Sequence, residues 1–507
     1  MEDHEETSLS PKDEEGLWVE LEGCISKTCD NHEAIDDTLR TWLDLTSKLR
    51  ERSSDSSDAV ISSAQSLLAS HLYQENKDYV RTQIIFSLIQ EDETGKLHAI
   101  SCLLLLDGHH DEAVFPRMIG ESCFPRLLEL LNGRRDDDPR LHRFLLHLMY
   151  EMSRMWRLDI EDLASVGDDF VHYLFQIIEG LSDDVHDPYH YPTIRVLLVL
   201  NEQYMLASTD TGDPKNPMGP LTNRIVKCLS YNGASFRTFG ENIILLLNRE
   251  TETSLQLLIL KLLYLLFTNK ATYEYFYTND LRVLLDVIIR NLMDLPDEKM
   301  SLRHTYLRVL YPLLAHTQLS QPPHYKCDEV LRLLDVLRGS HNFHFAPADE
   351  TTLRLVARVA KVKWIEKEEL AHSPPGGSDV ARKILGMSLP QQHSTVSVND
   401  IAEVTEKPGV QTPSRSKGTT EAEVEGGVEG GEEAIAVVKR AKKPLPAVPA
   451  HRHGTPFTSV STPTVPVNGT VKSAKKIPPK APPPRRQGKM RMVEHPPPEP
   501  IQEPSSH

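Results

Sequence analysis

The chain has 507 residues, of which 39% are hydrophobic and 25% are charged, and its formal net charge is −17. At roughly 100–200 residues per domain, this length allows either a few domains or one long repeat array. The acidic balance argues against a broad nucleic-acid or anionic-lipid footprint on the folded part. Six cysteines scattered over the sequence are too sparse for a disulfide scaffold and suit a reducing compartment.

The first segment of the chain is acidic. Its first 16 residues hold seven carboxylates and one lysine, the opposite of a signal or transit peptide. The most apolar stretch, residues 255–267, is interrupted by Gln256 and Lys261 and is shorter than the roughly 20 residues that a membrane span needs. We therefore expect a soluble cytoplasmic protein with an acidic, disordered N-terminus over residues 1–15.

Residues 16–371 carry the hydrophobic period of α-helices. In 280–294, six aliphatic residues recur at helical spacing, and Asn279 precedes them as a candidate N-cap. The same period recurs in 302–314, where Pro312 predicts a kink. Further helical stretches are predicted at 62–73, 96–106, 125–131, 141–156, 170–178, 193–206, 241–247, 252–268, 329–337 and 351–370.

This pattern predicts an all-α fold. Many helices joined by short linkers, with few of the alternating patterns that strands show, indicate stacked helical pairs or triplets, as in an armadillo/HEAT-like helical solenoid. The helices do not repeat with a clean period near forty residues, so an ordinary globular helical domain without repeats is the alternative.

Residues 372–507 differ sharply in composition. They hold 21 of the 35 prolines, and their only aromatic residue is Phe457. Because such a segment cannot bury enough apolar surface to offset the entropy of chain ordering, we expect a disordered, proline-rich tail. Within it, residues 439–491 carry 13 Lys or Arg and no acidic residue, so attraction to an anionic membrane is one alternative use of this charge.

Two motifs in the tail are typical of SH3-domain ligands. Each follows the pattern basic-x-x-Pro-x-x-Pro, in which a left-handed polyproline helix places both prolines on one face. The prolines fit an aromatic-walled groove, and the cation meets an acidic loop of the SH3 domain. The predicted SH3-ligand residues are Lys443, Pro446, Pro449, Lys476, Pro479 and Pro482. A plain solvated linker is the alternative.

The sequence lacks the common catalytic signatures. It contains no phosphate-binding loop, dinucleotide fingerprint, zinc-protease motif or nucleophile elbow. Cys24, Cys29 and His32 offer three metal ligands but no second close pair to complete a tetrahedral site. The stretch 109–112 (HHDE) has metal-binding and acid–base residue types, yet on a polar loop it is better interpreted as a solvated turn. We therefore expect a binding protein with no catalytic residues, no metal and no cofactor.

Several segments together resemble the leucine-rich signature of the WISH/DIP/SPIN family. They are LNEQY at 200–204, FGENIILLLNRE at 239–250, LLYLLFT at 262–268, LRHTYLRVLYPLL at 302–314, TQL at 317–319 and YK at 325–326. The resemblance implies an armadillo-like helical fold. It also implies binding and activation of the actin-related protein 2/3 complex without a preformed mother filament, so that a linear actin filament is nucleated.

The proline-rich tail makes the chain similar to the fungal branch of that family. This branch implies cortical endocytic actin patches as the location and SH3-bearing endocytic or actin proteins as further partners. The animal branch carries its own SH3 domain at the N-terminus, whereas residues 1–60 here are predicted to be acidic linker and helix. A passive helical scaffold that links SH3 proteins to another cargo is the alternative function.

One face of the 302–314 helix is a candidate contact with the nucleator complex. Its apolar stripe is expected to face inward, which would leave Arg303, His304 and Arg308 outward to meet acidic residues of a partner helix. The alternative is that these arginines pair with neighbouring carboxylates of the acidic body.

Overall fold

The computed structural model describes residues 11–52, 56–133, 138–182, 184–209, 221–339, 349–372 and 401. The chain divides into two units, residues 1–419 and 420–507, and all the described residues lie in the first. The predicted acidic segment 1–15 lies only partly within the described residues, and the predicted SH3-ligand motifs lie outside them.

The described residues are helical and contain no strand. The first eleven helices are α1 (Pro11–Ile25), α2 (His32–Arg52), α3 (Ser56–Ala69), α4 (His71–Glu75), α5 (Lys77–Gln90), α6 (Thr94–His110), α7 (Val114–Gly120), α8 (Cys123–Gly133), α9 (Pro139–Met155), α10 (Ile160–Ser165) and α11 (Asp168–Glu179). The helix α1 begins at Pro11, ahead of the predicted domain start at residue 16.

The remaining helices include three short 3₁₀ turns, labelled η. They are α12 (Tyr191–Thr209), α13 (Arg224–Asn232), η1 (Gly233–Ser235), α14 (Arg237–Arg249), α15 (Thr253–Thr268), η2 (Lys270–Thr272), α16 (Thr278–Asp294), α17 (Met300–His316), η3 (Gln318–Ser320), α18 (Cys327–Leu337), α19 (Glu350–Ala360) and α20 (Lys363–His372). Within the part of the chain that the structure describes, the last helix ends one residue after the predicted domain end at 371.

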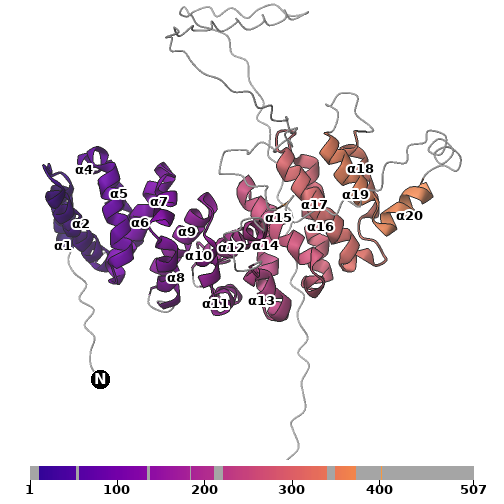
Figure 1. Ribbon diagram of the computed structural model, residues 1–507, viewed down its shortest axis with the longest axis horizontal. Helices are drawn as coiled ribbons and strands as arrows, with labels where there is room; N and C mark the ends of the chain where they lie inside the picture. The colour runs from indigo at the N-terminus through magenta and orange to yellow at the C-terminus, as the bar shows by residue number, and fades with distance from the viewer. Residues whose placement is uncertain are drawn as a thin grey trace, which may run out of the picture. The chain divides into compact units, whose positions relative to one another are not determined.

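The helices pack against partners that are close in chain order, as in an armadillo/HEAT-like solenoid (Figure 1). The central series runs α6, α9, α12, α15, α17 and α19, each packed on the next. The helix α15 is enclosed on nearly all sides because α12, α14 and α17 surround it. The predicted all-α solenoid is confirmed.

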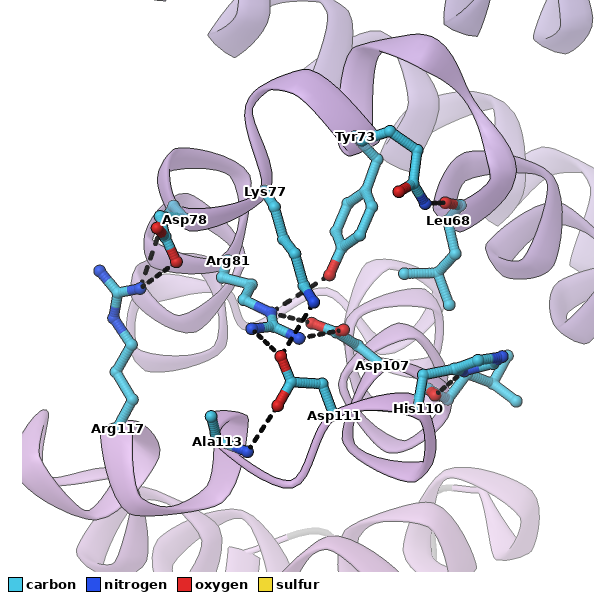
Figure 2. A network of polar contacts seen from close by, with 12 residues as sticks. Leu68, Tyr73, Lys77, Asp78, Arg81, Asp107, His110, Asp111, Ala113 and Arg117 are labelled. Atoms are coloured by element: carbon cyan, nitrogen blue, oxygen red, sulfur yellow. Dashed lines mark hydrogen bonds and ion pairs between the residues drawn. The ribbon is translucent and has the colours of Figure 1, made fainter. Parts of the chain in front are cut away.

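A polar network fixes the N-terminal helices α4 to α7 (Figure 2). Arg81 on α5 donates from Nε and Nη2 to the two carboxylate oxygens of Asp107 on α6, at 2.6 Å each. Its Nη1 donates to Asp111 at 2.9 Å, which also accepts from Lys77 at 2.9 Å. Bonds from Lys77, the Ala113 backbone and Arg81 hold the pKa of Asp111 far below its usual range. Within the stretch 109–112, Asp111 therefore joins the helices, whereas His109, His110 and Glu112 are exposed as expected of a solvated turn.

A second buried cluster joins α2, α6 and α9. Arg50 donates from Nε to Nδ1 of His98 at 2.9 Å and also pairs with Asp138. Asp138 in turn caps α9 by accepting from the backbone N–H of Arg140 at 2.9 Å. His98 is fully buried, and burial beside Arg50 lowers its pKa to about 4. The folded protein therefore holds His98 neutral at neutral pH.

This cluster predicts acid sensitivity. An unfolded chain protonates histidine as the pH falls through about 6.5, whereas folded His98 stays neutral until about pH 4. Between those values the unfolded state binds more protons than the folded state. The free energy of unfolding therefore decreases as the pH is lowered, by about 3 kcal/mol from this residue over the whole interval. Urea unfolding at pH 7, 6 and 5 should show the fall, and His98→Gln should make it shallower, while partly buried His147, whose pKa is also lowered to about 4, still contributes. An equally steep fall in the variant would contradict the assignment.

Candidate interaction surface

The polar residues of the 200–204 signature segment lie in the interior. Glu202 on α12 forms an ion pair with Lys261 on α15, and the Lys261 side chain is fully buried. Asn201 accepts from Asn223 at 2.8 Å, and Asn223 caps α13 by accepting from the backbone N–H groups of Ile225 and Val226. These residues join helices to each other and do not present a surface.

The next two signature residues fix loops between helices. Gln203 donates to the backbone carbonyls of Ser153 and Trp156 at 2.6 and 2.9 Å, and its Oε1 accepts from the Leu158 backbone N–H at 3.0 Å. Tyr204 donates to the carbonyl of Leu163 at 3.1 Å. The signature therefore stiffens the body, because Gln203 and Tyr204 hold backbone groups that burial would otherwise leave unpaired, while Asn201 and Glu202 pair with side chains of other helices.

The expectation of an outward cationic face on α17 is wrong. His304 and Arg308 are 7% and 9% exposed, and the Arg303 side chain is 12% exposed. Arg303 donates to the Leu295 carbonyl at 2.9 Å and pairs with Asp297 at 3.0 Å. The physical reason is that α15, α16 and α19 all pack on α17, so the side opposite the apolar stripe is also covered.

His304 connects α17 to the start of α19. Its Nε2 lies 3.0 Å from Oδ2 of Asp349 and 3.1 Å from the Thr352 hydroxyl. Asp349 also caps α19 by accepting from the Thr352 backbone N–H at 3.0 Å. Burial lowers the pKa of His304, although Asp349 opposes that shift. This residue is thus part of a helix junction.

Reversing charge at Arg303 and Arg308 together should destabilise the fold. The new carboxylates would be largely buried, and one would lie near Asp297 and the Leu295 carbonyl, at a combined cost of about 2–4 kcal/mol. Thermal unfolding followed by circular dichroism measures the loss, with exposed Arg354→Glu on α19 as the control. An unchanged melting temperature in the double variant would show that both side chains can leave the interior.

Three interhelical loops, each containing one of the 3₁₀ turns and each separated from the next by two helices, lie side by side. They span residues 233–236, 269–277 and 317–326. Arg237, the first residue of α14 after the first loop, donates to the Glu274 carbonyl in the second loop at 3.4 Å, and Tyr275 donates back to the Phe236 carbonyl at 2.5 Å. Gln318 in the third donates to the Phe276 carbonyl in the second at 3.4 Å. These bonds hold the three loops as one surface.

Cations and aromatic rings alternate on this surface. The Arg237 guanidinium stacks 4.6 Å from the Tyr277 ring centre, and the Arg282 guanidinium stacks 5.4 Å from that of Tyr325. We call Arg237, Tyr277, Arg282 and Tyr325 the arginine–tyrosine row. The sequence analysis did not identify this row, although the alternating tyrosines 273, 275 and 277 could have pointed to an aromatic surface at this loop. Tyr277 is exposed and the other three residues are partly buried. Arginine and tyrosine are residue types enriched among those that dominate the binding energy of protein interfaces.

The candidate metal ligands Cys24, Cys29 and His32 do not come together as a metal site. Cys24 and Cys29 both contact Thr38, at 3.5 Å from its carbonyl and hydroxyl oxygens, and His32 stacks on Tyr79. No group of three His, Cys, Asp or Glu side chains is arranged to hold a metal within the described ranges. None of the helices that the structure describes is both long and apolar enough to cross a bilayer.

The chain is similar to fungal proteins over much of its length. Residues 186–330 match the family model described as SPIN90/Ldb17, leucine-rich domain. Protein dip1 of Schizosaccharomyces pombe is 31% identical over 310 residues, which cover 60% of this chain and 81% of that protein. Protein LDB17 of Saccharomyces cerevisiae is 32% identical over 269 residues, 52% of each chain. Protein LDB17 of Eremothecium gossypii is 30% identical over 306 residues, 54% of this chain and 64% of its own.

Among solved structures, the chain matches the crystal structure of an engineered protein with 10% identity and a TM-score of 0.28, covering 57% of this chain and 97% of that one. The relationship therefore rests on sequence. The matched family segment includes the 200–204 residues that hold the interhelical loops and the whole of α17. With its coverage of most of the Schizosaccharomyces protein, the chain belongs to the WISH/DIP/SPIN family, in its fungal branch.

Proposed function

We propose that this protein binds the actin-related protein 2/3 complex and activates it to seed linear actin filaments, acting by binding and not by catalysis. The observation that carries the proposal is family membership, with alignment over 60% of this chain. The proposed location is cytoplasmic, at cortical actin patches of endocytic sites. This location rests on the family resemblance alone.

A protein that activates its partner by binding alone needs a stiff body. A binding protein shifts a two-state machine only by the difference between its affinities for the two states. A surface that deforms to fit both states would lose that difference. Buried pairs such as Lys261 with Glu202 and the backbone bonds of Gln203 hold neighbouring helices in fixed positions. This stiffness supports the proposal that the body prefers one shape of its partner.

A bulk actin polymerisation assay tests the activator function. The full-length chain should shorten the lag of actin assembly in the presence of the purified nucleator complex and leave it unchanged without the complex. An unchanged lag in the presence of the complex would favour a passive helical scaffold.

We further propose that the tail recruits SH3-domain proteins. The two motifs with Lys443 and Lys476 support this by their pattern of a cation and paired prolines. Binding of the full-length chain to an array of SH3 domains should be lost when Pro446, Pro449, Pro479 and Pro482 are all changed to alanine. Retained binding would assign recruitment to another segment, such as the prolines at 496–498.

A further inference from the structure

The arginine–tyrosine row stands out in an acidic protein. Residues 372–507 hold 18 basic and 13 acidic residues of totals of 56 and 73, so the acidic excess lies in residues 1–371. Many arginines of this body are committed to carboxylates, as Arg81 is to Asp107 and Arg126 is to Asp92. Among the described residues, neither Arg237 nor Arg282 forms an ion pair with a carboxylate.

Both guanidinium groups are held in place with hydrogen-bonding capacity left over. Arg237 stacks on Tyr277 and also lies 5.5 Å from the ring centre of Tyr275, while Arg282 stacks on Tyr325. In both arginines Nε is shielded from solvent and has no acceptor among the described residues. Stacking on a ring fixes a guanidinium without using its N–H donors. Nη1 of Arg237 donates to the Glu274 carbonyl at 3.4 Å and Nη1 of Arg282 to Asn279 at 3.5 Å, and both bonds are long, so the outer Nη1–Nη2 edge of each group is left to match a carboxylate.

Apolar surface lies beside the two cations. Tyr277 is 58% exposed and Val283 is 53% exposed, although both are large hydrophobic residues. On α16 the partly buried Arg282 and the exposed Val283, Arg290 and Met293 share one face, opposite the buried leucines of that helix. This surface therefore offers two cationic forks and an apolar strip next to them.

We infer that the arginine–tyrosine row binds an acidic peptide segment of a partner protein. Carboxylates of the peptide form forked hydrogen bonds with Arg237 and Arg282, and an apolar side chain of the peptide packs on Tyr277 and Val283.

The surroundings favour a short acidic segment over a large polyanion. Lys326, next to Tyr325, already pairs with Asp286 at 3.2 Å and with Glu329 at 3.0 Å, so the positive charge is confined to the row. A nucleic acid or an anionic membrane would extend over the acidic remainder of the body and be repelled there. This inference does not depend on the proposed activator function, since it concerns peptide binding alone.

Fluorescence anisotropy with the full-length chain tests the inference. The probe is a labelled 12-residue peptide in which glutamate alternates with leucine or serine, and the matched peptide carries glutamine in place of glutamate. The wild-type chain should bind only the glutamate peptide and more weakly at 200 mM than at 50 mM salt. Arg237→Glu with Arg282→Glu should weaken binding by at least about tenfold.

Two further double variants serve as a control and as a test of the hydrogen-bonding geometry. Arg52→Glu with Arg354→Glu reverses two exposed charges on α2 and α19 and should leave binding unchanged. Arg237→Lys with Arg282→Lys keeps the charge but removes the fork, and should weaken binding several-fold even where the glutamate variant fails to fold. The inference is overturned if the wild-type chain does not bind the glutamate peptide, or if the lysine and glutamate variants bind it as tightly as wild type.

Discussion

Replacing Lys261 by methionine should lower the free energy of unfolding by about 3–5 kcal/mol. Lys261 is fully buried in α15, and its partner Glu202 on α12 has a side chain that is 10% exposed. Methionine fills similar space but leaves the Glu202 carboxylate in the interior without its cation. The carboxylate must then take up a proton or draw water into the core, and both outcomes oppose folding.

A double variant separates charge from packing in this pair. Lys261→Met with Glu202→Leu removes both charges, so most of the lost stability should return. Urea unfolding at pH 7 measures both proteins against wild type. If the single variant is as stable as wild type, the ion pair does not hold α12 to α15, and the argument for a stiff centre fails.

Replacing Arg81 by methionine should have an effect of similar size, about 3–5 kcal/mol, in the N-terminal helices. The side chains of Arg81 and Asp107 are 6% and 5% exposed, and two hydrogen bonds of 2.6 Å join them. The variant would leave Asp107 buried and remove one of the cations that hold Asp111 (Figure 2). Tyr73 would also lose the N–H that its hydroxyl accepts at 3.2 Å.

Lys77→Ala provides the matched comparison for Arg81. Lys77 also pairs with Asp111, but its side chain is 41% exposed, so its loss should cost less than about 1 kcal/mol. Thermal unfolding followed by circular dichroism ranks the two variants. Equal losses from both would contradict the view that burial gives the Arg81–Asp107 pair its importance.

The sequence predicted most helices because their apolar stripes are long. The stretch 280–294 lies within α16, and Pro312 lies inside α17 as expected. Boundaries were less predictable, since they depend on single hydrogen bonds. Asn279 does not cap α16; the helix begins at Thr278, where the Tyr277 backbone N–H donates to Asp280 at 3.3 Å.

Two predicted stretches are each two helices. The stretch 62–73 is interrupted at Ser70, whose hydroxyl accepts from the Tyr73 backbone N–H at 3.2 Å and starts α4. The stretch 351–370 divides at residues 361–362 into α19 and α20. An apolar period continues across such breaks because both helices bury the same side, so periodicity alone does not reveal them.

The surface was harder to predict than the core. A stripe on 302–314 indicates which side faces the core but not how many helices cover the other side, and α17 has neighbours on both. The alternative that the arginines pair with nearby carboxylates is the one that Arg303 follows with Asp297. The arginine–tyrosine row depends on loops more than thirty residues apart in the chain, a proximity that no local pattern encodes.

The central claim is that this helical body acts by holding the actin-related protein 2/3 complex in its active shape. Single-filament fluorescence microscopy tests it most directly, with labelled actin, the purified complex and the full-length chain, and with no preformed filaments. The account predicts new unbranched filaments in numbers that rise with the concentration of the chain and require the complex. Filament numbers equal to those with the complex alone, or filaments that arise only as branches on existing ones, would contradict it.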